Sequence, residues 1–146
     1  SDVCSSDLMR VVLTGGPSEL EVKTGQEIKT HMSQPVLNLI GKDTIKQSVA
    51  LLQRARVLIS PDSGPAHLAS AVGTPVIGLY AATPSARSGP YNSLELCVDK
   101  YVEAAHRFRN KEPDSLRWGQ RIEYPGVMDL IEVEEVIEKL NQFMKS

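Results

Sequence analysis

Two polar clusters interrupt the apolar pattern of this chain, and both combine residue types that can hold an anion. The larger cluster, SPDSGPAH over residues 60–67, contains Asp62, Ser63, Gly64 and His67. If a helix begins inside it, the first backbone N–H groups lack partners and the helix dipole is positive there, which suits a phosphate. The glycine lets a ligand approach the backbone closely, and the histidine adds a donor. We therefore predict a phosphate anchor in this segment.

The carboxylate of Asp62 is the part of this cluster that does not suit a phosphate, because it repels an anion. It suits sugar hydroxyls, or it orients backbone amides. A structural interpretation fits as well: Asp62 or Ser63 caps the helix, and His67 is a partly buried histidine. The spacing alone leaves both interpretations open. In the first interpretation the backbone donors are the N–H groups of Ser63, Gly64, Ala66 and His67, since Pro65 has none.

The second cluster, TGGPSE over residues 14–19, carries a weaker signal. It lacks the full dinucleotide-binding fingerprint and the lysine of a P-loop. A tight turn from strand to helix explains Gly15 and Gly16 without any ligand. Glu19 has two interpretations. It either accepts hydrogen bonds from vicinal hydroxyls, as ribose-binding acids do, or is a solvated acid favoured by the helix dipole. Arg87, in a polar loop, faces either an anionic ligand or solvent.

Other candidate residues favour structural roles. His31 and His106 have no partner at metal-ligand spacing, and no acidic pair has it, so we predict no metal and no cofactor. Cys4 and Cys97 are expected to be free thiols. The short basic stretch HRFRNK, residues 106–111, is interpreted first as a surface helix and second as a membrane-surface contact. Trp118 is expected to be a packing anchor.

The elements that must position these residues follow from periodicity and helix-cap signals. Ser18 and Glu21 have capping-box spacing, and Thr44 and Gln47 repeat it. Strands that alternate with helices predict an α/β fold with a parallel sheet flanked by helices. Ligands bind such sheets beyond the carboxyl ends of the strands, where both clusters lie. The expected strands are 11–13, 35–41, 56–60, 75–80 and 94–98, and the expected helices are 18–31, 65–73, 102–108, 133–143 and one beginning at Thr44.

Composition excludes several functional classes. The chain has 146 residues, a formal net charge of −2 and 5% aromatic residues, so it lacks the basic and aromatic surface expected for nucleic-acid binding. No apolar run approaches the ~18 residues of a membrane span. The stretch SDVCSSDL lacks the features of a signal peptide. We expect residues 1–8 to be a disordered or artificially joined leader and residues 9–146 to form one domain.

The motifs together resemble the family 9 glycosyltransferases, the heptosyltransferase-like enzymes of lipopolysaccharide core assembly. The similarity lies in TGGPSE, in DSGPAHLA followed by GTPVIGLY, and in SGPY. It is strong from Val11 to Tyr91, and the tail beginning RWGQRIEYPG is also similar. Either half of the central motif would be weak by itself, whereas both in this order are specific.

The resemblance implies a GT-B fold of two three-layer, Rossmann-like domains. Residues 9–146 would correspond to the C-terminal one, which binds the nucleotide-sugar donor. It implies that Asp62, Ser63, Gly64 and His67 line the diphosphate and sugar of the donor. Glu19 would hold the ribose hydroxyls. Backbone around Ile40 would meet the base, and the loop 82–91, with Arg87, would edge the cleft.

The implied function is inverting transfer of a sugar from a nucleotide-diphosphate sugar, ADP-heptose, to a lipopolysaccharide core acceptor. The family's acceptor domain, with its catalytic base, has no counterpart here, so we expect this chain alone to bind donor without transferring it. The expected location is the cytoplasm, with at most a peripheral contact with the inner membrane. Two alternatives stay open. One is a nucleotide-sugar epimerase, which would turn a radiolabelled nucleotide-sugar into its epimer, and the other is a non-catalytic nucleotide-binding fragment.

Overall fold

The computed structural model describes residues 9–146, and the chain divides into two compact units, one ending at Ala50 and the other beginning at Leu51. The predicted leader, residues 1–8 with Cys4, lies outside the described residues. None of the helices in the described part combines the length and the apolar character that a membrane crossing requires. Each unit is described by itself below.

The first unit is built around two parallel strands. β1 (Val11–Leu13) pairs with β2 (Val36–Asn38), and α1 (Glu19–His31) connects them. Ser18 caps α1, as its spacing predicts, because its hydroxyl accepts the Glu21 N–H at 3.3 Å. α2 (Ile45–Arg54) begins in this unit and ends in the second.

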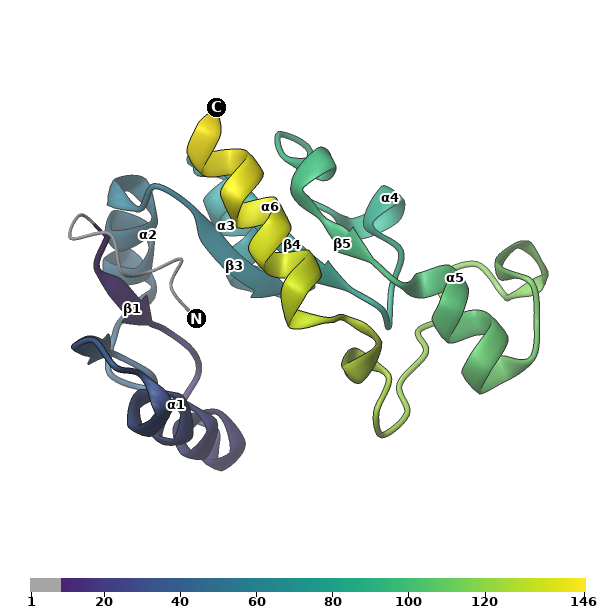
Figure 1. Ribbon diagram of the computed structural model, residues 1–146, viewed down its shortest axis with the longest axis horizontal. Helices are drawn as coiled ribbons and strands as arrows, with labels where there is room; N and C mark the ends of the chain where they lie inside the picture. The colour runs from purple at the N-terminus through teal and green to yellow at the C-terminus, as the bar shows by residue number, and fades with distance from the viewer. Residues whose placement is uncertain (1–8) are drawn as a thin grey trace. The chain divides into compact units, whose positions relative to one another are not determined.

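The second unit is a three-layer arrangement. β3 (Leu58–Pro61), β4 (Val76–Tyr80) and β5 (Val98–Asp99) form a parallel sheet in the order β3-β4-β5. α3 (Gly64–Ala71) contacts β3 and β4, and α6 (Val133–Lys145) crosses the other face over β4 and β5 (Figure 1). The central strand β4 is almost wholly buried, which explains its continuous apolar sequence.

Two buried clusters hold the second unit together and fix the ends of its strands. One lies under α3 and is made of Leu52, Ala66, Ala69 and Val76. The other supports the segments after β5 and is made of Tyr101, Ala104, Ala105, Ile122 and Val127. Alanines in both clusters let neighbouring backbones pack closely. The remaining elements are α4 (Ser85–Ser88), η2 (Leu94–Leu96), α5 (Tyr101–Ala104), a π-helical turn η3 (Ala105–Arg109), η4 (Pro113–Ser115) and η5 (Met128–Leu130).

The predicted alternation of helices with parallel strands is confirmed, whereas the predicted strand 94–98 is mostly wrong. Residues 94–96 form the 3₁₀ turn η2, and β5 begins only at Val98. The buried hydroxyl of Ser93 accepts the Val76 N–H at 3.0 Å and so ties the chain to the start of β4. The turn then buries Leu96 and Cys97, which an extended strand would place on opposite faces.

The two residues Cys97 and Trp118 differ in how well their predicted roles agree with the structure. Cys97 is a free, buried thiol, as predicted, and burial raises its pKa. Trp118 was expected to anchor packing, and this expectation is wrong: the residue is 89% exposed. Its exposure follows from the turn that carries it, which is described below.

Candidate functional site

The amino-terminal end of α3 is the centre of the predicted site. β3 ends at Pro61, and Ser63 is the N-cap residue of α3 in extended conformation. Its hydroxyl does not cap the helix but lies 2.8 Å from the Ser60 hydroxyl. The N–H groups of Ser63 and Gly64 donate to no other residue in the described range. The Ala66 N–H donates to the Ser63 carbonyl at 3.1 Å, so the prediction that it is free is wrong.

The space in front of this helix end is open. Apart from the adjacent residues and the backbone of the same helix, no described atom lies within 4 Å of the position that a Cβ on Gly64 would occupy, and the residue itself is exposed. The side chain of His67, in the first turn, is 54% exposed, so it is not the partly buried histidine of the structural interpretation. Two backbone donors, a helix dipole and an imidazole therefore border a space that an anion can enter.

Asp62 contacts side chains rather than the helix backbone. Its Oδ2 accepts hydrogen bonds from Thr83 Oγ1 at 2.7 Å and Ser88 Oγ at 3.2 Å. Its Oδ1 lies 3.7 Å from Nε2 of His67. The structure thus gives neither Asp62 nor Ser63 the capping bond that the structural interpretation required. Asp62 instead fixes the loop after β4 next to the histidine.

That loop is held at several points. Tyr80, at the end of β4, donates its phenol hydrogen to the Ser88 carbonyl at 3.1 Å. Burial, reinforced by nearby acidic groups, raises the pKa of Tyr80 to about 12, so the phenol remains a donor at neutral pH. Asp99, at the end of β5, accepts from the N–H and the hydroxyl of Ser85 at 2.7 and 2.6 Å. Arg87 lies on α4 within this loop and is half-buried.

The structure therefore brings together residues that follow three neighbouring parallel strands. Asp62 follows β3, Thr83 and Ser88 follow β4, and Asp99 ends β5. The carboxyl ends of parallel strands meet at one edge of a sheet, where open α/β proteins bind ligands. Sequence analysis named Asp62 and missed Thr83, Ser88 and Asp99. The available signal was their place at strand ends in a polar loop.

The first unit holds the second predicted cluster, and Glu21 rather than Glu19 contacts its turn. Glu21 accepts the Gly16 N–H at 3.0 Å and the Ser18 hydroxyl at 2.6 Å. These hydrogen bonds hold the pKa of Glu21 below its usual value. Glu19 is exposed and accepts no hydrogen bond from the described residues. The Glu21 carboxylate therefore occupies the turn formed by residues 16–18.

The backbone behind this turn is closed by local hydrogen bonds. The Gly41 N–H donates to the Gly15 carbonyl at 3.0 Å, and the Ile40 N–H donates to Asn38 Oδ1 at 3.1 Å. Gly41 has a φ of +69°, a conformation that favours glycine. Gly15 and Ile40 therefore lie close together in this unit, with Gly16 next to them in the chain.

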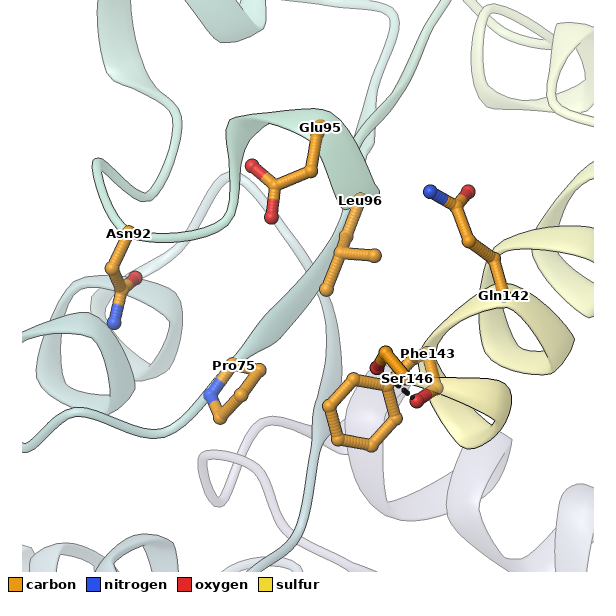
Figure 2. Close-up of a pocket in the computed structure, with 7 residues that line it drawn as sticks. All are labelled: Pro75, Asn92, Glu95, Leu96, Gln142, Phe143 and Ser146. Atoms are coloured by element: carbon orange, nitrogen blue, oxygen red, sulfur yellow. Dashed lines mark hydrogen bonds between the residues drawn. The ribbon is translucent and has the colours of Figure 1, made fainter.

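A hollow of about 270 Å³ lies elsewhere in the second unit, where β4 begins rather than where it ends. Figure 2 shows Pro75, Leu96 and the ring of Phe143 around it, with Glu95 as its acidic residue. Its lining brings together no acid–base pair or cluster of cations, and the volume is below that of typical ligand pockets. Among residues 9–146 no group of three His, Cys, Asp or Glu side chains stands at metal-binding geometry.

Comparison with known proteins places this arrangement in context. The family model described as glycosyltransferase family 9 (heptosyltransferase) matches residues 2–116. A lipopolysaccharide core heptosyltransferase, OpsX, of Haemophilus influenzae is 35% identical over 92% of this chain. A lipopolysaccharide heptosyltransferase 3 of Escherichia coli is 43% identical over 66% of it. The chain spans 39% and 29% of the lengths of these relatives. These names favour a transferase over the epimerase alternative.

Two solved structures share the fold. A glycosyl transferase family 9 protein from Veillonella parvula superposes with a TM-score of 0.68 at 21% identity, over 94% of this chain and 37% of its own. The ADP-heptose lps heptosyltransferase II of E. coli superposes with a TM-score of 0.64 at 22% identity, over 93% of this chain and 36% of its own. Both likenesses support the predicted GT-B-type α/β fold.

Proposed function

Because this chain belongs to glycosyltransferase family 9, we propose that it is the donor-binding part of a heptosyltransferase of lipopolysaccharide core biosynthesis. The proposed donor is a nucleotide-diphosphate sugar, ADP-heptose, and the proposed acceptor is the lipopolysaccharide core. The proposed location is the cytoplasm. Residues 9–146 would serve as the nucleotide-sugar-binding domain of the longer protein, with the acceptor and the catalytic base provided outside it.

One observation carries the proposal: the open amino-terminal end of α3. The donor's diphosphate would accept hydrogen bonds from the N–H groups of Ser63 and Gly64 and from the imidazole of His67. Negative charge grows on the diphosphate as the sugar leaves, and donors already fixed in place stabilise that charge without rearrangement. The acceptor hydroxyl would attack the anomeric carbon from the opposite face, with a base taking its proton, so that the configuration inverts.

Asp62 is proposed to recognise the sugar rather than the phosphates. Its Oδ2 already accepts two hydrogen bonds from the loop after β4, whereas Oδ1 has the more distant His67 as its neighbour. Oδ1 would accept a hydrogen bond from a sugar hydroxyl. The same carboxylate would orient the imidazole toward the diphosphate.

Separate roles are proposed for the first unit and for Arg87. Glu19, whose carboxylate is not occupied by described residues, would accept hydrogen bonds from the ribose hydroxyls. The backbone at Gly15, Gly16 and Ile40 would face the nucleoside. Replacement of Glu19 by glutamine would then weaken nucleotide binding, whereas Glu21→Gln would act on the fold of the turn. Arg87 would approach the anionic donor from α4.

Calorimetric titration of the chain with ADP, UDP and GDP tests the donor site. We expect ADP to bind, and His67→Ala to weaken its binding about tenfold or more, since a hydrogen bond to a charged group contributes ~1.5–3 kcal/mol. His106→Ala is the matched control, because His106 is also half exposed and lies outside the proposed site. Equal losses in both variants, or no nucleotide binding by the unmodified chain, would contradict the proposal.

Gly64→Ala separates binding from folding. A methyl group at this position meets no described atom outside the adjacent residues and the backbone of the same helix. The free energy of unfolding should therefore change by less than ~1 kcal/mol, because the helix preference of alanine is opposed by the restriction on a residue before proline. The same methyl group would occupy the proposed diphosphate position, and ADP binding should fall at least tenfold. Urea unfolding and calorimetry on one preparation give both values. A variant that binds ADP normally would overturn the proposed position of the phosphates.

A further inference from the structure

A strongly charged segment follows α5 and is separate from the donor site. We call residues 105–121 the basic loop; they begin with η3 and extend away from the end of β5 (green in Figure 1). The basic loop contains five Lys or Arg and two Asp or Glu, a net charge of +3, in a chain whose total is −2. Residues 42–56 also carry a net charge of +3, and what distinguishes the basic loop is that its cations accompany the exposed Trp118.

The basic loop presents the chain's single tryptophan at the tip of a tight turn. The Gln120 N–H donates to the Arg117 carbonyl at 2.9 Å, and Gly119 has a φ of +79°. A positive φ at the third position is what a type II turn requires, which explains the glycine. Trp118 occupies the second position and is 89% exposed.

Both sides of this turn are attached to the core, so the exposure of Trp118 is imposed by the fold. Leu116 packs against the buried cluster that contains Tyr101, and the Tyr101 hydroxyl donates to the Gln120 carbonyl at 3.2 Å. Ile122 is fully buried, and its N–H donates to the Ala82 carbonyl at 2.9 Å. A large apolar ring held in water by an anchored turn is unfavourable unless it meets a partner.

Most of the cations in the basic loop are not neutralised by neighbouring acids. Arg107, Lys111 and Arg117 are exposed and form no ion pair with residues in the described range. Arg109 donates to the Tyr124 hydroxyl at 2.7 Å, and that ring stacks on Phe108 with centroids 5.8 Å apart. The pairs that do form, His106 with Glu112 and Arg121 with Glu123, leave these four charges available.

We propose that the basic loop is a contact site for an anionic lipid surface. Tryptophan favours the boundary between headgroups and acyl chains, where its ring is apolar on one side and its N–H is wet. Lysine and arginine beside it are attracted to anionic headgroups, about 1 kcal/mol each near the surface, or about fivefold in affinity. A nucleic acid fits less well, because the rest of the chain is acidic and the tip offers one ring rather than a row of stacking platforms.

Trp118 itself reports on the proposed contact, since no other tryptophan contributes to the emission. The full chain is mixed with vesicles of phosphatidylcholine alone and of phosphatidylcholine with phosphatidylglycerol. We expect a blue shift and protection from acrylamide quenching with the anionic vesicles, and loss of both at high salt because the attraction is screened. Unchanged emission with anionic vesicles, or equal binding to both vesicle types, overturns the proposal.

Charge variants test which cations act. Lys111→Gln with Arg117→Gln should weaken co-sedimentation with anionic vesicles about 25-fold, from the fivefold effect per charge. Arg54→Gln with Arg56→Gln removes the same charge from exposed positions outside the basic loop and should have a much smaller effect. If both double variants weaken binding equally, the effect depends only on net charge and the proposal is overturned. Tighter binding to polyuridylate than to anionic vesicles would also overturn it. The assay needs no nucleotide sugar, so it is independent of the proposed function.

Discussion

At the scale of single residues, Asp62 shows how a carboxylate can lie next to a proposed diphosphate-binding site. Its negative charge would repel a phosphate in front of α3. The hydroxyls of Thr83 and Ser88 occupy Oδ2, and the imidazole of His67 lies near Oδ1. The carboxylate thereby becomes a support for the neighbouring groups. Its contribution to the free energy of unfolding should be measurable in variants of the residues that donate hydrogen bonds to it.

Thr83→Val tests this support without changing the size of the side chain. Thr83 is 2% exposed, so its hydroxyl is a buried donor to Asp62. Valine removes the donor and leaves the carboxylate with one hydrogen bond fewer, which should lower the free energy of unfolding by ~1–2 kcal/mol. Urea denaturation measures this. Thr83→Ser, which keeps the hydroxyl, should lose less; a valine variant as stable as the unmodified chain would show that the bond contributes nothing.

At the scale of elements, an ion pair connects the start of α5 with α6. Lys100 Nζ lies 2.7 Å from Glu135 Oε1, and Glu135 Oε2 also accepts the Glu132 N–H that begins α6. The bond to Lys100 holds the pKa of Glu135 below its usual value, and the bond to Glu135 raises the pKa of Lys100. Both shifts indicate that the charged pair is favoured in the folded state.

Glu135→Gln should flatten the dependence of stability on pH in acid. A depressed carboxyl pKa contributes stability that is fully present above the unfolded value of 4.5 and is lost as the pH falls through the folded value. Glutamine still accepts the Glu132 N–H but has no charge to lose. Urea midpoints from neutral pH to below 4.5 check this. Glu134→Gln, one residue earlier on α6, should keep the steep acid profile.

Elements whose signals are local were predictable, and those set by distant contacts were not. The Ser18 cap and the continuous apolar run of β4 are signals that lie within the elements they define. Gly73 follows the end of α3, as expected, and has a φ of +83°. The 3₁₀ turn η2 arises instead from Ser93, which bonds to the backbone of β4. The same limit explains why sequence analysis identified Asp62 but not Thr83, whose bond spans 21 positions.

At the scale of the whole molecule, charge and chemistry are distributed over separate segments. The proposed diphosphate contacts lie within residues 63–67, whereas the exposed Trp118 and four cations without an ion pair to described residues lie in the basic loop. The exposed Trp118 was mispredicted because a hydrophobic residue was assumed to be buried, whereas an anchored turn holds it in solvent. A basic loop that also presents an exposed tryptophan would make an acidic protein approach an anionic surface in a defined orientation.

Hydrogen exchange should resolve the two proposed contacts as two footprints. ADP should slow exchange in peptides covering residues 60–67 and 83–88, because its phosphates engage the first amides and the loop after β4 is tied to them. Anionic vesicles should slow exchange within residues 105–121 instead. Mass spectrometry of peptides after each addition measures this. Overlapping footprints, or protection of the segment around Gly64 by vesicles, would contradict the claim that nucleotide and lipid contact different segments.

The Cys97 thiol has a practical consequence. Its sulfur lies so close to Gly78 that a Cβ there would stand 2.9 Å away, and its pKa is raised by burial. Alkylation must therefore wait until the segment 94–97 detaches from the central strand. With Cys4 replaced by serine, the rate at which a thiol reagent modifies Cys97 measures the rate or extent of that local opening.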